Sequence, residues 1–315
     1  MPAIPLLSRF RGCLLGLAIG DALGGRFEAR SGSSIRERFA SVEALIRYPQ
    51  DEIWYTDDTQ MAIGIAQTLV EHGEIIESAL CKSWVRNYVR SRGYGRGARA
   101  VIEAMEEGKD HRVIAETYFV GGSYGNGAAM RVAPIGLVFR DNESRLWDQA
   151  RLSALPTHLH LLGIEGAQII ARAVAWASHA ERFDRAEFLA HMQAACTTPE
   201  FRAKLVLAER VQTPEELAQL GNGIEAIESA PTAIASFALT PDSYADTIAN
   251  VIFLGGDTDT MAAMAGAISG AFLGIDAIPP NLLQRLETSP QGRDFLLMLA
   301  DKLCQRYEQM KYDDA

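Results

Sequence analysis

The stretch from Phe10 to Leu23 constrains the fold most, because it is apolar on most of its sides and does not alternate between apolar and polar residues. A helix that is apolar all round has to be buried, so this stretch predicts a buried helix. Glycines recur in and directly after it at every fourth position, at Gly12, Gly16, Gly20 and Gly24. This spacing lays a smooth groove along one helix face. Close packing against another helix is the interpretation that we prefer for Gly12 and Gly16.

Most other apolar residues also recur at helical spacing, and alternating strand patterns are almost absent. No repeat of solenoid length, low-complexity linker or clear domain boundary interrupts the chain. We therefore predict one compact all-α domain over residues 1–315. Short helices within loop are expected over 29–53. Longer helices are expected over 59–72, 76–90, 97–107, 150–155, 161–178, 183–196, 199–211, 214–227, 231–239 and 243–253, after the acidic motif that follows 253, and once or twice over 279–312.

Composition narrows the class of protein. The 315 residues are 48% hydrophobic, enough for a substantial core, and the net charge of −10 argues against a general nucleic-acid surface. No apolar run approaches the roughly 20 residues that span a membrane. We expect a cytoplasmic protein, and a monomer because no segment resembles a dimer seam. The cysteines show no CxxC spacing and are expected to be reduced core thiols; they are Cys13, Cys81, Cys196 and Cys304.

Two similar acidic motifs each open a helical pattern. One follows an apolar run and two glycines and contains Asp257, Thr258, Asp259 and Thr260; the other contains Thr56, Asp57, Asp58 and Thr59. Four carboxylates and several hydroxyls, without histidine or cysteine, form a set of hard oxygen ligands. The sequence therefore predicts that the two helix starts meet around magnesium or manganese, as one ion or as a pair about 3.5–4 Å apart.

Helix capping is the alternative interpretation of these motifs, because Asp and Thr are favoured N-cap residues. A cap needs only one oxygen, however, and a second carboxylate beside the first would add repulsion without benefit. The occurrence of two double-Asp motifs in one chain favours the metal site over capping alone.

A glycine-rich loop over 118–131 runs into a helical pattern. Such a loop lets backbone N–H groups approach a phosphate, although a plain turn is an open alternative. Its aromatic residues suggest a base or a core contact, so together with the metal site the ligand resembles a nucleotide or nucleotide-sugar. Glu28, on a loop of glycine and serine, could supply general acid or base catalysis at a glycosidic carbon. His158 and His160, two residues apart, are left out of the metal site.

Four blocks together resemble the ADP-ribosylglycohydrolase family: RGCLLGLAIGDALGGRFE, WYTDDTQMA, GNGAAMR and LGGDTDTMAAMAGAISGA. The similarity runs in the expected order from about residue 10 to 275. It implies an all-helical fold and a binuclear magnesium or manganese centre. It also implies hydrolysis of the bond between the anomeric carbon of the distal ribose and an acceptor, which makes an ADP-ribosylated protein or an ADP-ribose ester the expected partner.

The resemblance also assigns roles by position. Glu28 matches a catalytic glutamate on a mobile loop, and we expect Glu28, Asp58 and Asp257 to share the positioning of water and the proton transfer. His158 is expected to contact the distal ribose. The metal ligands implied by the family are Thr56, Asp57, Asp58, Asp257, Asp259 and Thr260. The residues expected to hold the diphosphate and adenosine are Gly122, Ser123, Tyr124, Gly125 and Asn126, with Tyr118 and Tyr124 flanking the adenine.

The stretches GSYGNG and ARLSALPTH, and the spacing from Asp21 to Glu28, look most like the branch that cleaves O-linked ADP-ribose. Its substrates are ADP-ribosyl-serine, poly(ADP-ribose) and O-acetyl-ADP-ribose. The chain departs from this branch at Ala128-Ala129 and at Pro134. An arginine-directed hydrolase, a non-catalytic ADP-ribose-binding protein and a phosphotransferase of the DxDxT type are the alternatives. The last needs alternating strands and helices, which the sequence lacks.

Overall fold

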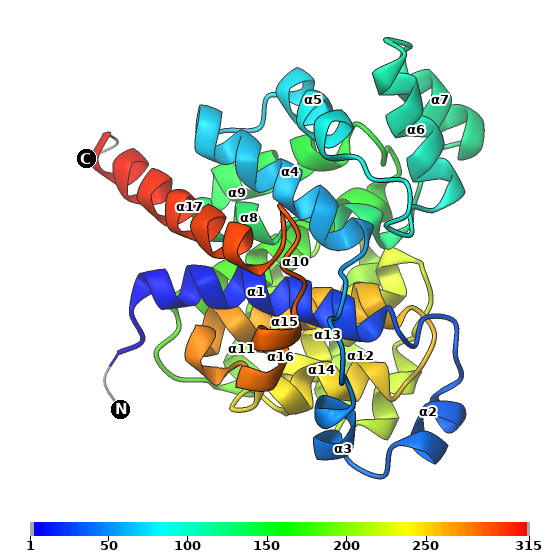
Figure 1. Cartoon of the computed structure of the whole chain (residues 1–315), viewed down its shortest axis with the longest axis vertical. Helices are drawn as coiled ribbons and strands as arrows, with labels where there is room; N and C mark the ends of the chain where they lie inside the picture. Colours follow the sequence, from blue (N-terminus) through cyan, green and yellow to red (C-terminus); the bar gives the residue numbers. More distant parts are fainter. Residues whose placement is uncertain (1–2, 314–315) are drawn as a thin grey trace.

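The computed structural model describes residues 3–313, and this part of the chain consists of α-helices joined by loops and 3-10 turns (Figure 1). Within these residues the β-type pairing is limited to isolated bridges, so the predicted all-α class is confirmed. The α-helices are α1 Leu6–Gly24, α2 Gly32–Arg38, α3 Val42–Arg47, α4 Asp57–His72, α5 Glu77–Asn87, α6 Arg96–Glu106, α7 His111–Tyr118, α8 Ala133–Val138, α9 Glu143–Ala154, α10 Leu161–His179, α11 Arg185–Ala195, α12 Pro199–Arg210, α13 Ala226–Leu239, α14 Tyr244–Ile252, α15 Thr258–Leu273, α16 Pro280–Arg285 and α17 Arg293–Asp313. The 3-10 turns are η1 Asn126–Ala128, η2 Glu215–Gln219 and η3 Ile275–Ala277.

The predicted helix over 214–227 is wrong. Only the short turn η2 forms there, and the chain then runs as a loop to the start of α13 at Ala226. Gly221 takes a φ of 103° in this loop, a conformation that ends a right-handed helix and that glycine adopts without steric cost. Pro231, predicted to begin the next helix, lies inside α13 instead.

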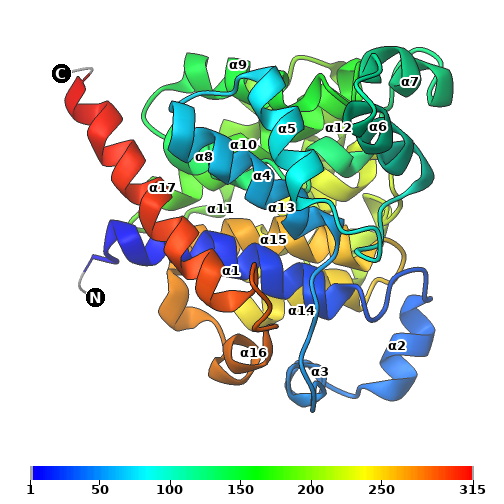
Figure 2. The same cartoon turned by 45° about the horizontal axis from the view of Figure 1, so that its top comes forward.

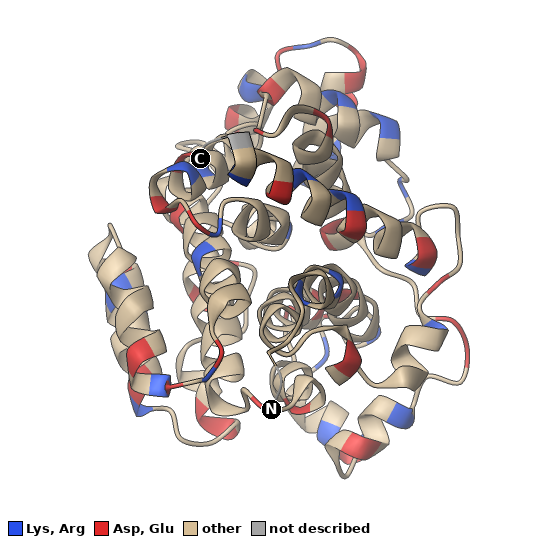
Figure 3. Cartoon of the chain, turned by 90° about the vertical axis from the view of Figure 1, so that its left-hand side faces the viewer, with Lys and Arg blue, Asp and Glu red and all other residues tan. Residues whose placement is uncertain are grey.

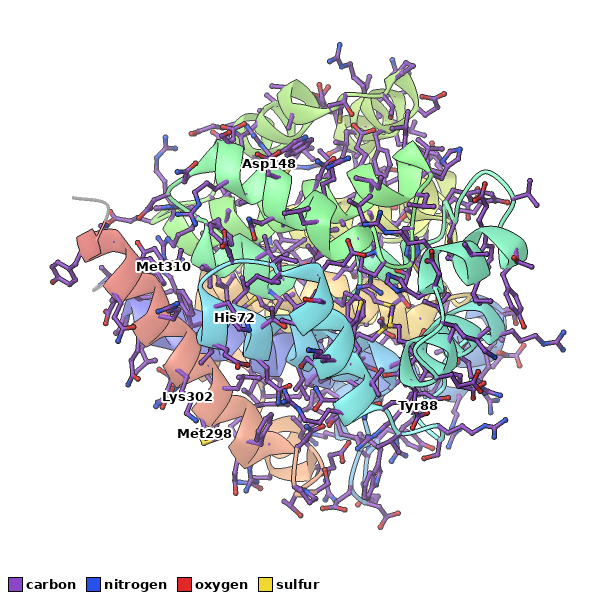
Figure 4. All side chains as sticks on the ribbon, turned by 90° about the horizontal axis from the view of Figure 1, so that it is seen from above. His72, Tyr88, Asp148, Met298, Lys302 and Met310 are labelled. Atoms are coloured by element: carbon purple, nitrogen blue, oxygen red, sulfur yellow. The ribbon has the colours of Figure 1, made fainter. Side chains whose placement is uncertain are left out.

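Two helices from opposite ends of the sequence, α1 and α15, run side by side through the middle of the molecule (Figures 1 and 2). Both are buried over most of their length, which confirms the buried helix predicted at residues 10–23. Helices α10, α13 and α14 pack around α15, and α17 packs along α1. Met298, Lys302 and Met310 mark the course of α17 in Figure 4.

The glycines of α1 explain how closely α1 and α15 approach. A Cβ on Gly20 would lie 2.0 Å from the carbonyl oxygen of Ala262, which is far inside the contact distance of two heavy atoms. The same holds at Gly12, Gly16 and Gly24, where an added Cβ would fall against the backbone of α15 or the turn after it. The close packing predicted for Gly12 and Gly16 is therefore confirmed. Since Gly24 at the end of α1 faces Thr258 at the start of α15, the packing also places the second acidic motif.

The positions of the charged residues and the state of the cysteines are consistent with the composition of the chain. Acidic and basic residues are interspersed over the helices seen in Figure 3. All four cysteines are buried and free, as predicted for core thiols. Among residues 3–313, no helix combines the length and the apolar character that crossing a lipid bilayer requires.

Candidate active site

The first acidic motif is held by a carboxylate on another helix. Asp21, fully buried near the end of α1, accepts hydrogen bonds from the backbone N–H of Thr56 at 2.9 Å and of Thr59 at 3.0 Å, and from the Thr59 hydroxyl. These N–H groups belong to the start of α4, where backbone donors lack partners within the helix. Asp21 therefore caps α4 from outside and leaves Asp57 and Asp58 free for another role.

The second motif is positioned by two asparagines. The backbone N–H of Asp257 donates to the Asn222 carbonyl at 2.9 Å, and the side-chain amide of Asn126 donates to a carboxylate oxygen of Asp257. The Asn222 side-chain amide also donates to the carbonyl of Gly255 at 3.1 Å. The loop before α13 and the glycine-rich loop thus both fix the orientation of Asp257.

Capping alone does not account for the two motifs. Neither Thr56 nor Asp257, the N-cap residues of α4 and α15, makes a side-chain capping hydrogen bond. The Thr56 hydroxyl instead donates to one carboxylate oxygen of Asp58 at 3.0 Å. The other oxygen of Asp58 is buried and has no hydrogen-bond partner among the described residues. A buried, unpartnered carboxylate oxygen is costly, and a bound cation would remove that cost.

The acidic side chains of the two motifs lie close enough to repel one another. Burial first, and then the charges of Asp21 and Asp259, raise the pKa of Asp57 to about 8. Burial and the same neighbours raise the pKa of Asp58 well above its usual value, and burial and Asp259 do so for Asp257. A folded protein tolerates such repulsion between carboxylates when bound protons or cations neutralise part of the charge.

The donor set fits a hard divalent cation. Carboxylate oxygens of Glu28, Asp257 and Asp259 lie within 4.8 Å of one another. The charge of Asp259 also contributes to the raised pKa values of Asp57 and Asp58. Oxygen ligands of this kind suit magnesium, manganese or calcium rather than softer metals. The structure thus brings together the two motifs that the sequence analysis singled out.

Glu28 lies on the turn after α1 and is exposed. Its neighbour Ala29 has a φ of 60° and donates its N–H to the carbonyl of Gly256 at 2.9 Å, while the N–H of Gly256 donates to the carbonyl of Arg30 at 3.0 Å. Main-chain bonds therefore tie the Glu28 turn to the residue before Asp257. The charge of Asp259, followed by burial, raises the pKa of Glu28.

A cavity of about 450 Å³ adjoins the acidic cluster, a volume in the range of small-molecule sites. Of the six predicted metal ligands, Thr56 alone is not part of its lining. Predicted residues that line it are Glu28, Asp57, Asp58, Ser123, Tyr124, Gly125, Asn126, His158, Asp257, Asp259 and Thr260. Further lining residues include Arg96, Gly97, Phe119, Arg131, Ile224 and Glu225.

The glycine-rich loop forms one wall of the cavity and is paired with the loop before α13. The N–H of Asn126 donates to the carbonyl of Ile224 at 2.9 Å, and the N–H of Ala226 donates to the carbonyl of Tyr124 at 3.1 Å. Gly122 lies outside the lining. It packs closely against the backbone at His160, because its φ is 89° and a Cβ there would lie 2.4 Å from the backbone nitrogen of His160.

The two tyrosines predicted to flank a base lie in different places. Tyr124 lines the cavity, is 50% exposed and contacts the edge of the His160 ring at a centroid distance of 5.7 Å. Tyr118, 54% exposed at the end of α7, is absent from the described lining, and its neighbour Phe119 borders the cavity instead. The prediction for Tyr118 gains no support from the structure.

A second network holds the chain segment that leads to the first motif. Glu287 is fully buried and pairs with Arg92, whose second terminal nitrogen lies 2.7 Å from the carboxylate. The same carboxylate accepts the N–H of Tyr55 at 3.2 Å, and Arg92 donates to the Tyr55 carbonyl at 2.7 Å. Tyr55 directly precedes Thr56, so this ion pair and Asp21 both position the start of α4.

Several of these residues have no role that their sequence position predicts. No sequence pattern predicts that Asp21 caps α4 or that Arg131 lines the cavity. Asn222 stands in a second GNG tripeptide, at residues 221–223, that repeats the one at 125–127. That repetition was a signal that could have identified it. Arg92 and Glu287 belong to no motif.

Comparisons with known proteins show which family the chain is similar to. A family model described as ADP-ribosylglycohydrolase matches residues 2–312. ADP-ribosylhydrolase ARH3 of Homo sapiens is 36% identical over 331 residues, covering 89% of this chain and 90% of the relative. ADP-ribosylhydrolase ARH3 of Xenopus tropicalis is 35% identical, covering 96% and 97%. The uncharacterized protein YegU of Escherichia coli (strain K12) is 32% identical, covering 90% and 93%.

A solved structure named ADP-ribosylglycohydrolase-related protein complex superposes with a TM-score of 0.74, covering 96% of this chain and 99% of that one. At 24% identity this likeness concerns the fold alone. The family model and the relatives above 30% identity match almost the entire sequence. The chain therefore belongs to the ADP-ribosylglycohydrolase family, which confirms the family and the enzyme class predicted from its motifs.

Proposed function

We propose that this glycohydrolase removes ADP-ribose from O-linked acceptors, such as ADP-ribosyl-serine, poly(ADP-ribose) or O-acetyl-ADP-ribose, with two magnesium or manganese ions. The general part, removal of ADP-ribose from an acceptor, rests on the family. The observation that carries the rest is the convergence of both double-Asp motifs in the lining of one cavity, which the glycine-rich loop also lines.

Six residues would hold the ions, namely Thr56, Asp57, Asp58, Asp257, Asp259 and Thr260. Bound there, the metal would supply charge for orienting the ribose hydroxyls and for lowering the pKa of a water. Asn126 holds Asp257 in place through its amide. The unpartnered oxygen of Asp58 is the observation, among the described residues, that best fits a cation-binding role.

Glu28 is our candidate for the proton transfer. Its carboxylate lies within 4.8 Å of Asp257 and Asp259 on a turn fixed by main-chain bonds. The charge of Asp259, as long as no cation compensates it, and then burial raise the pKa of Glu28. A carboxyl group with a raised pKa can donate a proton to the leaving oxygen at the anomeric carbon.

The remainder of the ligand would occupy the other end of the cavity. Backbone groups of Ser123, Gly125 and Asn126 would face the diphosphate, and Tyr124 would pack against the base. The loop is kept in place by its bonds to the segment at Ile224. In this proposal Phe119 takes the second aromatic position that the sequence analysis assigned to Tyr118.

The choice of an O-linked acceptor is supported by the resemblance of the stretches between the motifs to that branch, and the relatives named ARH3 are consistent with it. Ala128 and Ala129, which depart from the branch, are buried and lie outside the described lining of the cavity, as does Pro134. These departures therefore concern packing rather than ligand contacts. An arginine-directed activity is the alternative acceptor class.

A phosphotransferase and a non-catalytic binding protein fit the structure less well. The phosphotransferase required a sheet of alternating strands and helices, and the described residues form isolated bridges only; it is excluded. A non-catalytic, ADP-ribose-binding protein would keep the glycine-rich loop and the cavity. It would have no use for the adjacent buried carboxylates.

The experiment is to measure ADP-ribose release from matched peptides modified on serine or on arginine, in magnesium, in manganese and in EDTA. Release from the serine peptide alone, abolished by EDTA, is the expected result. Release from the arginine peptide alone would keep the site and contradict the acceptor. Tight ADP-ribose binding without release from either peptide would favour the non-catalytic protein.

We further propose a cytoplasmic monomer, as expected from the sequence. The cysteines, all free and buried, are compatible with a reducing compartment. Light scattering coupled to size-exclusion chromatography should return the mass of one chain. A dimer mass would contradict the expected oligomeric state without affecting the proposed chemistry.

A further inference from the structure

Arg131, which follows the GNGAAM sequence, is a buried cation without a carboxylate partner among the described residues. It is 1% exposed and lines the cavity. One terminal nitrogen donates to the Ser153 carbonyl at 3.0 Å and to the Thr157 hydroxyl at 2.8 Å, and the guanidinium lies 4.3 Å from the centre of the Trp84 ring. Burying a charged group costs free energy unless hydrogen bonds and packing compensate it. Arg131 is therefore a candidate for a functional role.

The hydroxyl of Thr157 has one proton to donate, and its direction follows from the neighbouring bonds. An arginine can only donate, so Arg131 uses a lone pair of the hydroxyl oxygen. The Ala154 carbonyl, 3.4 Å away, already accepts the backbone N–H groups of Thr157 at 3.0 Å and His158 at 2.9 Å. The much shorter contact is with Nδ1 of His158 at 2.7 Å, which makes Nδ1 the favoured acceptor of the hydroxyl proton.

A neutral imidazole whose Nδ1 accepts carries its hydrogen on Nε2. His158 is 7% exposed and lines the cavity, and among the described residues Nε2 makes no hydrogen bond of its own. A Cβ on Gly127 would lie 3.4 Å from this nitrogen, so the absence of a side chain at Gly127 keeps the space beside the nitrogen open. Nε2 is left to face a ligand.

The charge state of His158 follows from its surroundings. Burial, and then the charge of Arg131, lower the pKa of His158 to about 3. The ring is therefore neutral at physiological pH. A neutral donor adds no positive charge beside the carboxylates that would hold metal ions, and it can bind only an acceptor atom.

We propose that Arg131 and Thr157 are positioning residues that fix His158 as the neutral Nε2–H tautomer and so direct one hydrogen-bond donor at an acceptor oxygen of the ADP-ribosyl group. The identity of the ligand rests on the proposed function. The positioning relay rests on the hydrogen bonds alone. The relay extends from the buried Arg131 through one hydroxyl to the cavity.

The tautomer can be measured directly. Long-range proton–nitrogen correlation spectra of 15N-labelled protein distinguish the two neutral tautomers and the imidazolium by their ring nitrogen shifts. The signals of His158 would be assigned by their loss in the His158→Gln variant. We expect the Nε2–H form throughout the neutral pH range, without titration. The Nδ1–H form, or an imidazolium at neutral pH, would overturn the proposal.

Two variants of Thr157 separate positioning from packing. Thr157→Ser keeps the hydroxyl and should keep the tautomer and the affinity for ADP-ribose. Thr157→Val keeps the shape but removes the hydroxyl, so His158 should populate both tautomers and ADP-ribose should bind about two- to fivefold more weakly, in proportion to the lost Nε2–H population. An unchanged tautomer and unchanged affinity in a folded Thr157→Val variant would contradict the relay.

The two proposals fail in different ways. If the wild-type protein does not bind ADP-ribose by calorimetry, the proposed function fails, together with the identity of the ligand named here. The tautomer in the ligand-free protein would still decide whether Arg131 and Thr157 position His158. If ADP-ribose binds and is released from substrates while His158 is in the Nδ1–H form, the proposed function stands and the relay is refuted.

Discussion

Replacing Gly20 by alanine tests the packing that positions the second acidic motif, because two effects of this change have opposite signs. Helix propensity alone predicts that alanine in the middle of α1 stabilises the protein by about 1 kcal/mol. The new Cβ, however, would lie 2.0 Å from the carbonyl oxygen of Ala262 and 3.0 Å from the nitrogen of Ala263. Both are backbone atoms that cannot rotate away. Helices α1 and α15 would have to separate by about 1 Å or more to restore an ordinary contact distance.

Overpacking of this kind typically costs about 1–3 kcal/mol. After the propensity gain of about 1 kcal/mol is subtracted, we expect Gly20→Ala to lower the free energy of unfolding by about 0–2 kcal/mol, towards the upper end because the clash is with backbone atoms. Activity should fall by more than the loss of folded protein explains. Helix α15 carries Asp259 at its start, and a shift of about 1 Å would misplace this proposed metal ligand. Chemical denaturation gives the first quantity, and release of ADP-ribose measured under conditions in which the variant is folded gives the second.

Ala18→Gly is the matched control, since it makes the reverse exchange on the same buried helix without adding an atom. It should destabilise by about 1–2 kcal/mol through propensity and one lost methyl group. Refutation would be clear: if Gly20→Ala is as stable as the wild type or more stable, with full activity, the two helices are not in the close contact described.

Three further predictions concern other parts of the molecule. Asp259→Ala should abolish turnover while the thermal unfolding curve in EDTA remains cooperative; full activity would refute the metal site. Glu287→Gln, which leaves its mostly buried arginine partner without a counter-charge, should cost about 3 kcal/mol in denaturant unfolding, against about 1 kcal/mol or less for Asp301→Asn in a partly exposed pair. Burial raises the pKa of Asp141, but the hydrogen bond from Tyr307 helps to lower it, and the net pKa is lowered. This carboxylate therefore stabilises the fold above about pH 4 and loses that contribution in acid. Asp141→Asn should therefore be less stable than the wild type at neutral pH, by about 1 kcal/mol at most because the site is partly exposed, and the difference should disappear in acid.

Secondary structure was largely readable because its signal is local. The apolar spacing that predicts a helix repeats every three to four residues, and it located α1, α4, α10 and the two C-terminal helices α16 and α17. The failure over 214–227 has the same origin. Residue spacing there suits a helix, but the backbone conformation of Gly221 and the contacts of Asn222 with the second motif draw the segment into a loop.

The members of the metal site were also visible in the sequence, because their chemistry is carried by residue type. Two double-Asp motifs have an unusual composition wherever they stand. What the sequence did not reveal is how each motif is held. Asp21 caps α4 from 35 positions away, and Glu287 binds Tyr55 from 232 positions away. No periodic pattern connects residues at such separations.

The sequence by itself therefore determined the helical class, the glycine face of α1 and the oxygen-rich composition of the site. The tertiary structure alone decided that Gly24 meets Thr258, that Phe119 rather than Tyr118 borders the cavity, and that Arg131 reaches His158 through a threonine. The physical reason is range. Helical propensity and ligand chemistry belong to neighbouring residues, whereas the direction of a proton or the partner of a buried charge depends on side chains that only the packed fold brings together.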